Sequence, residues 1–223
     1  MRLCLPDFRL CAAPAVISGV ACLAILCSLD PAGDYPQSRQ GPGLTADESF
    51  NVHEGVRLVD AIPEWLTGRL STLEVFGDHN DLGLRNAPIG YYLADHPPLG
   101  RVWLGLSHQL ACAVSPPEDH PSPFVIAAAR TGSAFAFAFL VILVGYVSGK
   151  WYGPVAGMTA SASLVMMPRL FGHAHLAALE SVMSLAYAAV VFSVAGYWSK
   201  QSPPIRRTAI LTGLLFGLAL LTK

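Results

Sequence analysis

The chain is poor in charged residues. Of its 223 residues, 13% are Asp, Glu, Lys or Arg, whereas soluble domains usually carry about 25%. Hydrophobic residues make up 53% of the chain, and the mean hydropathy is +0.47. This composition excludes a disordered chain and an ordinary soluble enzyme, because it cannot supply a polar surface. The net charge of −1 gives no basic field for nucleic acid. The composition predicts a membrane protein.

Several motifs with a known chemistry are also missing. The five cysteines form no C-x-x-C pair and no zinc-binding spacing, so we expect them to act as small hydrophobic residues. The sequence has no internal repeat, no heptad pattern and no glycine-rich loop for phosphate. The glycines of residues 153–157 lie in an apolar segment, where we expect them to serve helix packing.

Long apolar runs are present instead. About 20 apolar residues cross the hydrocarbon core of a membrane. Five runs predict spans, the last of them cut by the chain end: residues 10–29, 126–149, 151–168, 175–199 and 207–223. The first run follows Arg2 and Arg9, as in a signal peptide, but the later runs favour an uncleaved anchor.

The basic residues orient these spans. With the N-terminus in the cytoplasm, the positive-inside rule is satisfied by six residues: Arg2, Arg9, Lys150, Lys200, Arg206 and Arg207. Residues 30–123 then form a long extracytoplasmic loop. The sequence therefore predicts an all-α polytopic protein of the plasma (inner) membrane, with its active site outside.

The outer loop contains two adjacent acids, Asp47 and Glu48. Thr45 as N-cap and Glu48 three residues later match a capping box, which predicts a short helix over 45–59 along the membrane surface. The two acids have two alternative roles. They cap the helix and interact with its dipole, or one of them is a general base for an acceptor hydroxyl.

A second stretch of the loop runs from His96 to Arg101. Two prolines directly after His96 predict a rigid bend, followed by an amphipathic surface helix over 102–114. His96 is either a loop residue without a role or a residue that binds a phosphate or positions an acid. We expect Arg101, which follows, to be an interfacial side chain that reaches toward water.

Glu180 is an acid inside an apolar run, where insertion costs about 2.5–3.5 kcal/mol. Helical spacing places it on one face with His173, Ala177 and Ser184, and places His175 on another. Glu180 is therefore a functional candidate, a hydrated interfacial residue, or part of a metal site with the two histidines. Arg130 and Lys223, at the outer ends of two spans, are interfacial anchors or contacts for an anionic headgroup.

Four segments together resemble the N-terminal part of GT-C-class membrane glycosyltransferases, in particular the protein O-mannosyltransferase and aminoarabinose-transferase-like group. They are the Asp47-Glu48 pair, the His-Pro-Pro-Leu-Gly-Arg stretch of 96–101, the Pro-Arg to Glu segment of 168–180, and the Gly-Leu to Thr-Lys ending of 213–223. Two positions depart from the family pattern, which often has Asp in place of Glu180 and Lys in place of Arg101. Complete members are roughly twice as long or more, so we expect the chain to be a truncated fragment of a GT-C-like helix bundle.

The resemblance implies inverting transfer of a sugar from a polyprenyl-phosphate donor to a hydroxyl of a protein, lipid or glycan. Asp47 is then the general base, and Glu48 orients it or contacts the acceptor. The leaving phosphate and donor have these candidate ligands: His96, Arg101, Arg130, Arg169, His173, His175, Glu180 and Lys223. No cofactor is indicated, and a divalent metal stays open. The alternatives are a polytopic transporter or lipid-flipping protein with Glu180 on its path, and an inactive membrane fragment.

Overall fold

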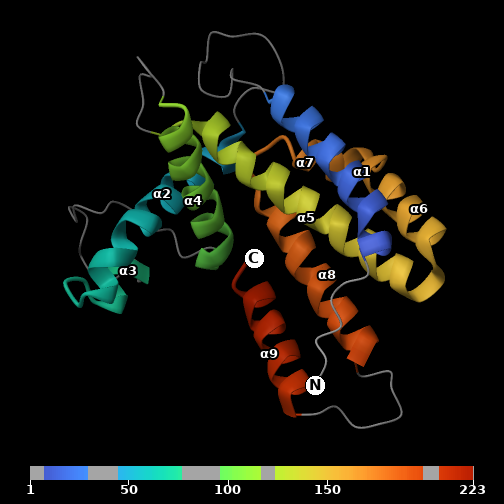
Figure 1. Cartoon of the computed structure of the whole chain (residues 1–223). Helices are drawn as coiled ribbons and strands as arrows, with labels where there is room; N and C mark the ends of the chain where they lie inside the picture. Colours follow the sequence, from blue (N-terminus) through green and yellow to red (C-terminus); the bar gives the residue numbers. More distant parts are fainter. Residues whose placement is uncertain (1–7, 30–44, 77–95, 117–123, 198–205, 223) are drawn as a thin grey trace. The chain divides into compact units, whose positions relative to one another are not determined.

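The computed structural model describes residues 8–29, 45–76, 96–116, 124–197 and 206–222 (Figure 1). All regular secondary structure in these residues is α-helical, which confirms the predicted all-α class. The helices are α1 (Phe8–Cys27), α2 (Ala46–Leu66), α3 (Thr72–Phe76), α4 (Pro98–Val114), α5 (Ile126–Tyr152), α6 (Pro154–Val165), α7 (Pro168–His173), α8 (Leu179–Tyr197) and α9 (Arg206–Leu220).

The chain forms two compact units. We call the first the span unit; it comprises Met1–Ser28, Ala134–His175 and Glu180–Ala219. We call the second the α2–α4 unit; it comprises Leu29–Ser133, Leu176–Leu179 and Leu220–Lys223. The short segments 176–179 and 220–223 therefore join a unit that is otherwise built from the predicted outer loop and the start of α5.

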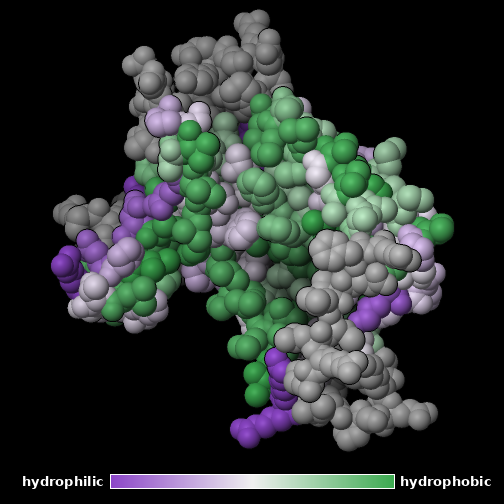
Figure 2. Space-filling view, viewed as in Figure 1, coloured by the Kyte–Doolittle hydropathy of each residue, from purple (hydrophilic) through white to green (hydrophobic). Residues whose placement is uncertain are grey.

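Three of the described helices are long and apolar enough to cross a membrane: Leu10–Cys27 in α1, Ile126–Tyr152, which is α5, and Leu179–Gly196 in α8. They coincide with the first, second and fourth predicted spans. The surface of α1 is largely hydrophobic in Figure 2, and its Val16 and Val20 side chains are 66% and 64% exposed. A surface of this kind suits lipid better than water.

The third predicted span differs from the structure. The run over 151–168 is divided, because α5 ends at Tyr152, Gly153 has a left-handed φ of +94° and Pro154 begins α6. Proline suits this first helical position, where its missing N–H has no helical partner. The 12 residues of α6 extend about 18 Å, which is too short for about 30 Å of hydrocarbon. The fifth predicted span, 207–223, corresponds to helix α9, which has 15 residues and begins with two arginines.

Small residues pack the span unit. A Cβ added to Gly145 would collide with the Ser161 hydroxyl, and one added to Gly157 would lie 2.6 Å from the Gly145 carbonyl oxygen. Ser161 Oγ donates a hydrogen bond of 3.2 Å to the Val141 carbonyl. Such close approach of small residues is how helices associate in lipid. The predicted packing role therefore holds for Gly157, whereas Gly153 interrupts the helix.

The α2–α4 unit is built on close contact between its two main helices. A Cβ on Gly55 of α2 would collide with the Arg101 carbonyl, and one on Gly105 of α4 would collide with the Gly55 carbonyl. The apolar core around this crossing consists of Val52, Val56, Leu104, Ile126, Ala129, Ala177 and Leu179. Both predicted loop helices are present, and each is longer than predicted: α2 continues to Leu66, and α4 begins at Pro98.

Candidate functional site

The start of α2 is fixed by the capping box that the sequence predicted. The Thr45 side chain accepts a hydrogen bond from the Glu48 backbone N–H at 3.4 Å, and the Thr45 backbone N–H donates to Glu48 Oε2 at 3.1 Å. These reciprocal bonds satisfy two amides that a helix start would leave without partners. They also hold the Glu48 carboxylate against the first turn of the helix.

Glu48 forms a buried, two-pronged ion pair with Arg130 of α5. Arg130 Nε donates to Glu48 Oε1 at 2.7 Å, Arg130 Nη2 donates to Oε2 at 2.8 Å, and both side chains are 0% exposed. The Ala177 backbone N–H also donates to Oε1, at 2.7 Å. One carboxylate thus ties together the start of α2, the first turns of α5 and the segment before α8. The predicted roles of Arg130, an interfacial anchor or a headgroup contact, are wrong because they require an exposed guanidinium.

These contacts determine the ionisation of Glu48. Burial by itself raises the pKa of the carboxyl, because it removes water from the charged form. The hydrogen bonds from Arg130, Ala177 and Thr45, together with the positive charge of Arg130, outweigh burial and lower the pKa of Glu48 below its ordinary value. A carboxylate held in its ionised form and saturated with donors is a poor proton acceptor. Glu48 is therefore suited to hold structure.

Asp47 has the opposite surroundings. It lies in the first turn of α2, beside Glu48, and its side chain is exposed. Successive helical residues point about 100° apart, so burying Glu48 in the unit turns Asp47 toward its surface. The structure separates the acid pair into a buried carboxylate with fixed partners and an exposed carboxylate next to it.

The backbone bends at His96, as predicted, and helix α4 begins two residues later, earlier in the sequence than predicted. Pro97 is the N-cap of α4 and Pro98 is its first residue, so the prolines occupy positions where a missing N–H costs nothing. His96 is half-buried just before the helix. Arg101 is 1% exposed, and its Nε donates to Asn51 Oδ1 of α2 at 3.2 Å. The prediction of an interfacial Arg101 is therefore wrong.

Segments from all four motifs of the resemblance meet in the α2–α4 unit. The Leu99 backbone N–H of α4 donates to the Leu221 carbonyl at 2.9 Å. A Cβ added to Gly100 would lie 2.9 Å from both Leu179 Cδ2 and the Thr222 carbonyl oxygen. With the bond from Ala177 to Glu48, these contacts join residues that lie as many as 129 positions apart in the sequence. Lys223 lies outside the described residues.

The other candidates belong to the span unit. Helix α7 ends at His173 and α8 begins at Leu179, so the prediction that His173, Ala177, Glu180 and Ser184 share one helix face is wrong. His173 Nδ1 nevertheless lies 3.8 Å from Glu180 Oε2, with both side chains 31% exposed. Glu180 occupies the first turn of α8 and not a position deeper in the span.

The contacts of His175 do not include that pair, and Arg169 lies on the same helix as His173. His175 Nδ1 lies 2.9 Å from the Phe171 carbonyl oxygen, its Nε2 lies 3.1 Å from Ser28 Oγ, and its ring meets Phe171 edge-on. Arg169 is exposed on α7. In the described part of the chain, no three His, Cys, Asp or Glu side chains are grouped to hold a metal ion. The metal-site alternative for Glu180 and the two histidines therefore has no structural basis.

Sequence analysis missed three polar residues of α2. Asn51 and Glu54 are 7% and 5% exposed. The burial of Asn51 could have been predicted from helical spacing, because Asn51 lies three positions after Glu48 and therefore on the same helix face. His53 packs on Phe124 with the ring centroids 3.8 Å apart, and Arg57 lies over the same ring. Burial first and the Arg57 charge second lower the pKa of His53, which favours its neutral form.

No family model, no curated protein and no solved structure matches the chain.

Proposed function

We propose that the chain is a membrane glycosyltransferase that moves a sugar from a polyprenyl-phosphate donor to a hydroxyl acceptor at the outer membrane face. The observation that supports this proposal is the meeting of the four motif segments in the α2–α4 unit. Contacts of Glu48 with Ala177, and of α4 with Leu221 and Thr222, bring them together. A structural role alone does not require that these particular segments meet beside an exposed acid.

Asp47 is the proposed general base. It takes the proton from the acceptor hydroxyl while the acceptor oxygen bonds to the anomeric carbon. The bond from that carbon to the phosphate oxygen breaks, and the lipid phosphate leaves with the electron pair. An inverting displacement of this kind has an oxocarbenium-like transition state, as in glycoside hydrolysis. Asp47 suits the role because its carboxylate is exposed to an acceptor.

Glu48 is proposed as a positioning residue. Its bonds to Arg130 and Ala177 fix the first turn of α2, which carries Asp47. A contact between Glu48 and the acceptor, the other role that the resemblance implies, would require the carboxylate to leave these partners. Fixing the base in advance lowers the entropy lost on reaching the transition state. The two acids thus have different tasks at the same helix start.

The leaving phosphate needs positive or hydrogen-bonding partners. Arg101 and Arg130 are buried in the α2–α4 unit, and we assign them to holding its helices. His96, half-buried at the start of α4, is the proposed hydrogen-bond donor to the phosphate in this unit. Lys223 is a further candidate from the sequence.

The test is Asp47→Asn in the full chain, embedded in membranes and supplied with polyprenyl-phosphate sugars. Asparagine keeps the shape of the side chain in the first turn of α2 but cannot take a proton. We expect transfer to fall at least about 100-fold, the lower end of what general-base catalysis contributes. The measurement is the amount of labelled sugar on the acceptor fraction over time.

A matched control is Glu64→Gln, which neutralises another exposed acid on α2, near the far end of the helix. We expect transfer by this variant to equal that of the unsubstituted chain. Undiminished transfer by Asp47→Asn would remove Asp47 from the mechanism. If the unsubstituted chain transfers no sugar from any polyprenyl-phosphate donor, the proposed function itself is overturned.

A further inference from the structure

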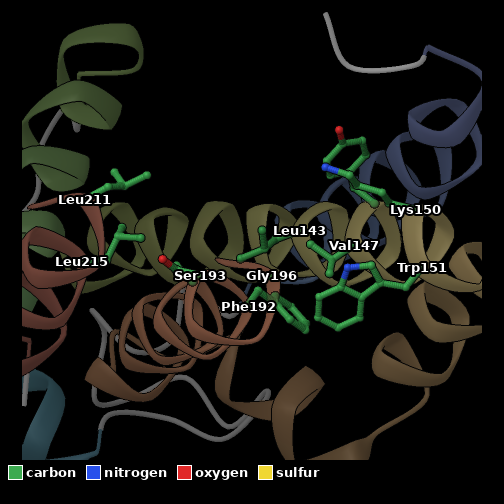
Figure 3. A pocket seen from close by; sticks show the side chains of 11 residues that line it. Leu143, Val147, Lys150, Trp151, Phe192, Ser193, Gly196, Leu211 and Leu215 are labelled. Atoms are coloured by element: carbon green, nitrogen blue, oxygen red, sulfur yellow. The ribbon is translucent and has the colours of Figure 1, made fainter. Parts of the chain in front are cut away.

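The span unit contains a groove of about 520 Å³ between α5, α8 and α9 (Figure 3). Its volume lies within the range of small-molecule and cofactor sites, about 300–1,000 Å³. All of the residues that line it belong to the span unit, so it shares no residue with the proposed sugar-transfer site. Most are apolar, and Lys150 is the one charged side chain among them.

The charge lies at one end of the groove. In Figure 3, Leu211 and Leu215 of α9 lie at one side of the view, Ser193 of α8 lies near the middle, and Lys150 and Trp151 of α5 lie at the other. The groove is therefore amphipathic along its length. A ligand that fits it has a long apolar part and an anionic end.

Specific contacts hold the walls together. Ser193 Oγ lies 2.8 Å from Thr212 Oγ1, which joins α8 to α9. Trp151 meets Phe192 edge-on with their ring centroids 5.8 Å apart, which joins α5 to α8. Gly196 lines the groove, and the place of its missing Cβ has no atom within 4 Å. A larger side chain at this position therefore meets open space beside the groove wall.

The end with Lys150 has the features of a membrane–water boundary. Lys150 lies in the last turn of α5 and is exposed, and Trp151 and Tyr152 beside it are 41% and 78% exposed. Tryptophan and tyrosine gather at the headgroup level of membranes, and basic residues between membrane helices bind anionic headgroups. A lysine at this depth complements a lipid phosphate while the groove below accepts hydrocarbon.

We propose that the groove between α5, α8 and α9 binds one acyl chain of an anionic glycerophospholipid, whose phosphate pairs with Lys150. The acyl chain lies against Phe192 and the α9 leucines. Phosphatidylglycerol serves as the probe, and phosphatidylcholine with the same acyl chains serves as the lipid without net charge. The proposal does not depend on sugar transfer, because Asp47 and the rest of the α2–α4 unit take no part in it.

The experiment measures lipid retained by the purified full chain, by native mass spectrometry after incubation with an equimolar mixture of the two lipids. We expect the unsubstituted chain to retain one phosphatidylglycerol in preference to phosphatidylcholine. Lys150→Gln is expected to lower the affinity for phosphatidylglycerol about fivefold, the effect of one lysine near an anionic headgroup. Lys150→Arg keeps the charge and is expected to retain the preference.

A second variant tests the groove without touching the charge. Gly196→Leu fills the open space and is expected to abolish retention of both lipids. Its matched control is Gly213→Leu on α9, which also meets open space but is not among the residues that line the groove. We expect this control to retain lipid like the unsubstituted chain, which separates groove filling from a general effect of leucine on folding.

Three results would overturn the proposal. The first is equal retention of both lipids by the unsubstituted chain. The second is full retention of phosphatidylglycerol by Gly196→Leu. The third is displacement of phosphatidylglycerol by an equimolar amount of polyprenyl phosphate, which would assign the groove to the sugar-donor lipid.

Discussion

The two units bury different kinds of polar side chain. In the described span unit, the buried polar side chains are all serines: Ser18, Ser161, Ser181 and Ser193. In the described α2–α4 unit, they include four charged residues: Glu48, Glu54, Arg101 and Arg130. Of the four serines, Ser18 Oγ donates to the Ala138 carbonyl at 2.7 Å and Ser161 Oγ donates to the Val141 carbonyl at 3.2 Å, whereas Ser193 Oγ lies 2.8 Å from Thr212 Oγ1.

This difference follows from the surroundings of each unit. Helices that meet lipid gain little from burying apolar surface, so small residues and hydroxyls bring their backbones close. A buried charge is costly unless a partner and further hydrogen bonds satisfy it, but a satisfied pair restricts how its segments can be arranged. Close packing thus holds the span unit, and a charged centre fixes the arrangement of the α2–α4 unit.

The largest expected effect comes from removing one member of the buried pair. Glu48→Ala leaves Arg130 buried without its carboxylate, which typically costs about 3–5 kcal/mol. We expect the free energy of unfolding of the purified chain in detergent to fall by this amount, measured by denaturant titration. A loss below about 1 kcal/mol would contradict the view that the pair organises the α2–α4 unit.

The double variant Glu48→Met with Arg130→Met sharpens this test. It removes both charges and keeps apolar volume, so it is expected to recover part of the lost free energy of unfolding. Recovery is incomplete because the Ala177 N–H still loses its acceptor. A double variant as unstable as Glu48→Ala would show that hydrogen bonding, and not charge pairing, dominates at this centre.

The same pair predicts how stability depends on pH. The pKa of Glu48 is lowered on folding from its ordinary value of about 4.5. Its contribution to stability is therefore fully present above about pH 4.5 and is lost as the pH falls through the lowered, folded-state pKa. Denaturant titrations at several pH values below 5 measure this loss. The Met–Met double variant is the control, and an equal acid sensitivity in that variant would assign the loss to other acids.

Glycine substitutions test packing in each unit, with a smaller effect. Alanine at Gly55 meets the backbone carbonyl of Arg101, which cannot move without shifting α4. We expect Gly55→Ala to lower the free energy of unfolding by about 1–3 kcal/mol. Alanine at Gly145 meets the Ser161 and Pro14 side chains, so the loss is expected to be smaller. Gly213→Ala meets open space and serves as the control. Equal losses at Gly55 and Gly213 would contradict this packing.

Local signals in the sequence predicted the helices well, and failed where a partner was distant. Thr45 and Glu48 lie within one helical turn, so their capping box could be predicted. The partner of Glu48 lies 82 positions away on α5. No spacing rule reaches that far, and Arg130 was therefore placed at a surface. The different surroundings of the exposed Asp47 and the buried Glu48 could be recognised only once Arg130 was known to be the partner of Glu48.

Proline and glycine were the other source of error. Pro97 and Pro98 restrict the backbone in the same way whether they form a bend or start a helix, and the residues that follow decide between the two. The apolar run of 151–168 hides a break at Gly153, because hydropathy does not detect a left-handed φ. The helix predicted through His173 and Glu180 was also wrong, because α7 ends at His173 and α8 begins at Leu179 although most residues between them are apolar.

The smallest expected effect separates the half-buried acid of the span unit, Glu180, from the buried acid of the α2–α4 unit, Glu48. Glu180 lies 3.8 Å from His173, and both side chains are 31% exposed. Water screens such a pair, so Glu180→Gln is expected to change the free energy of unfolding by less than about 1 kcal/mol. Glu48→Gln, with the same change of chemistry, is the matched comparison and is expected to lose several times more. The two glutamates are the same residue type and differ in burial. Equal losses would therefore mean that the span unit also depends on a charged centre.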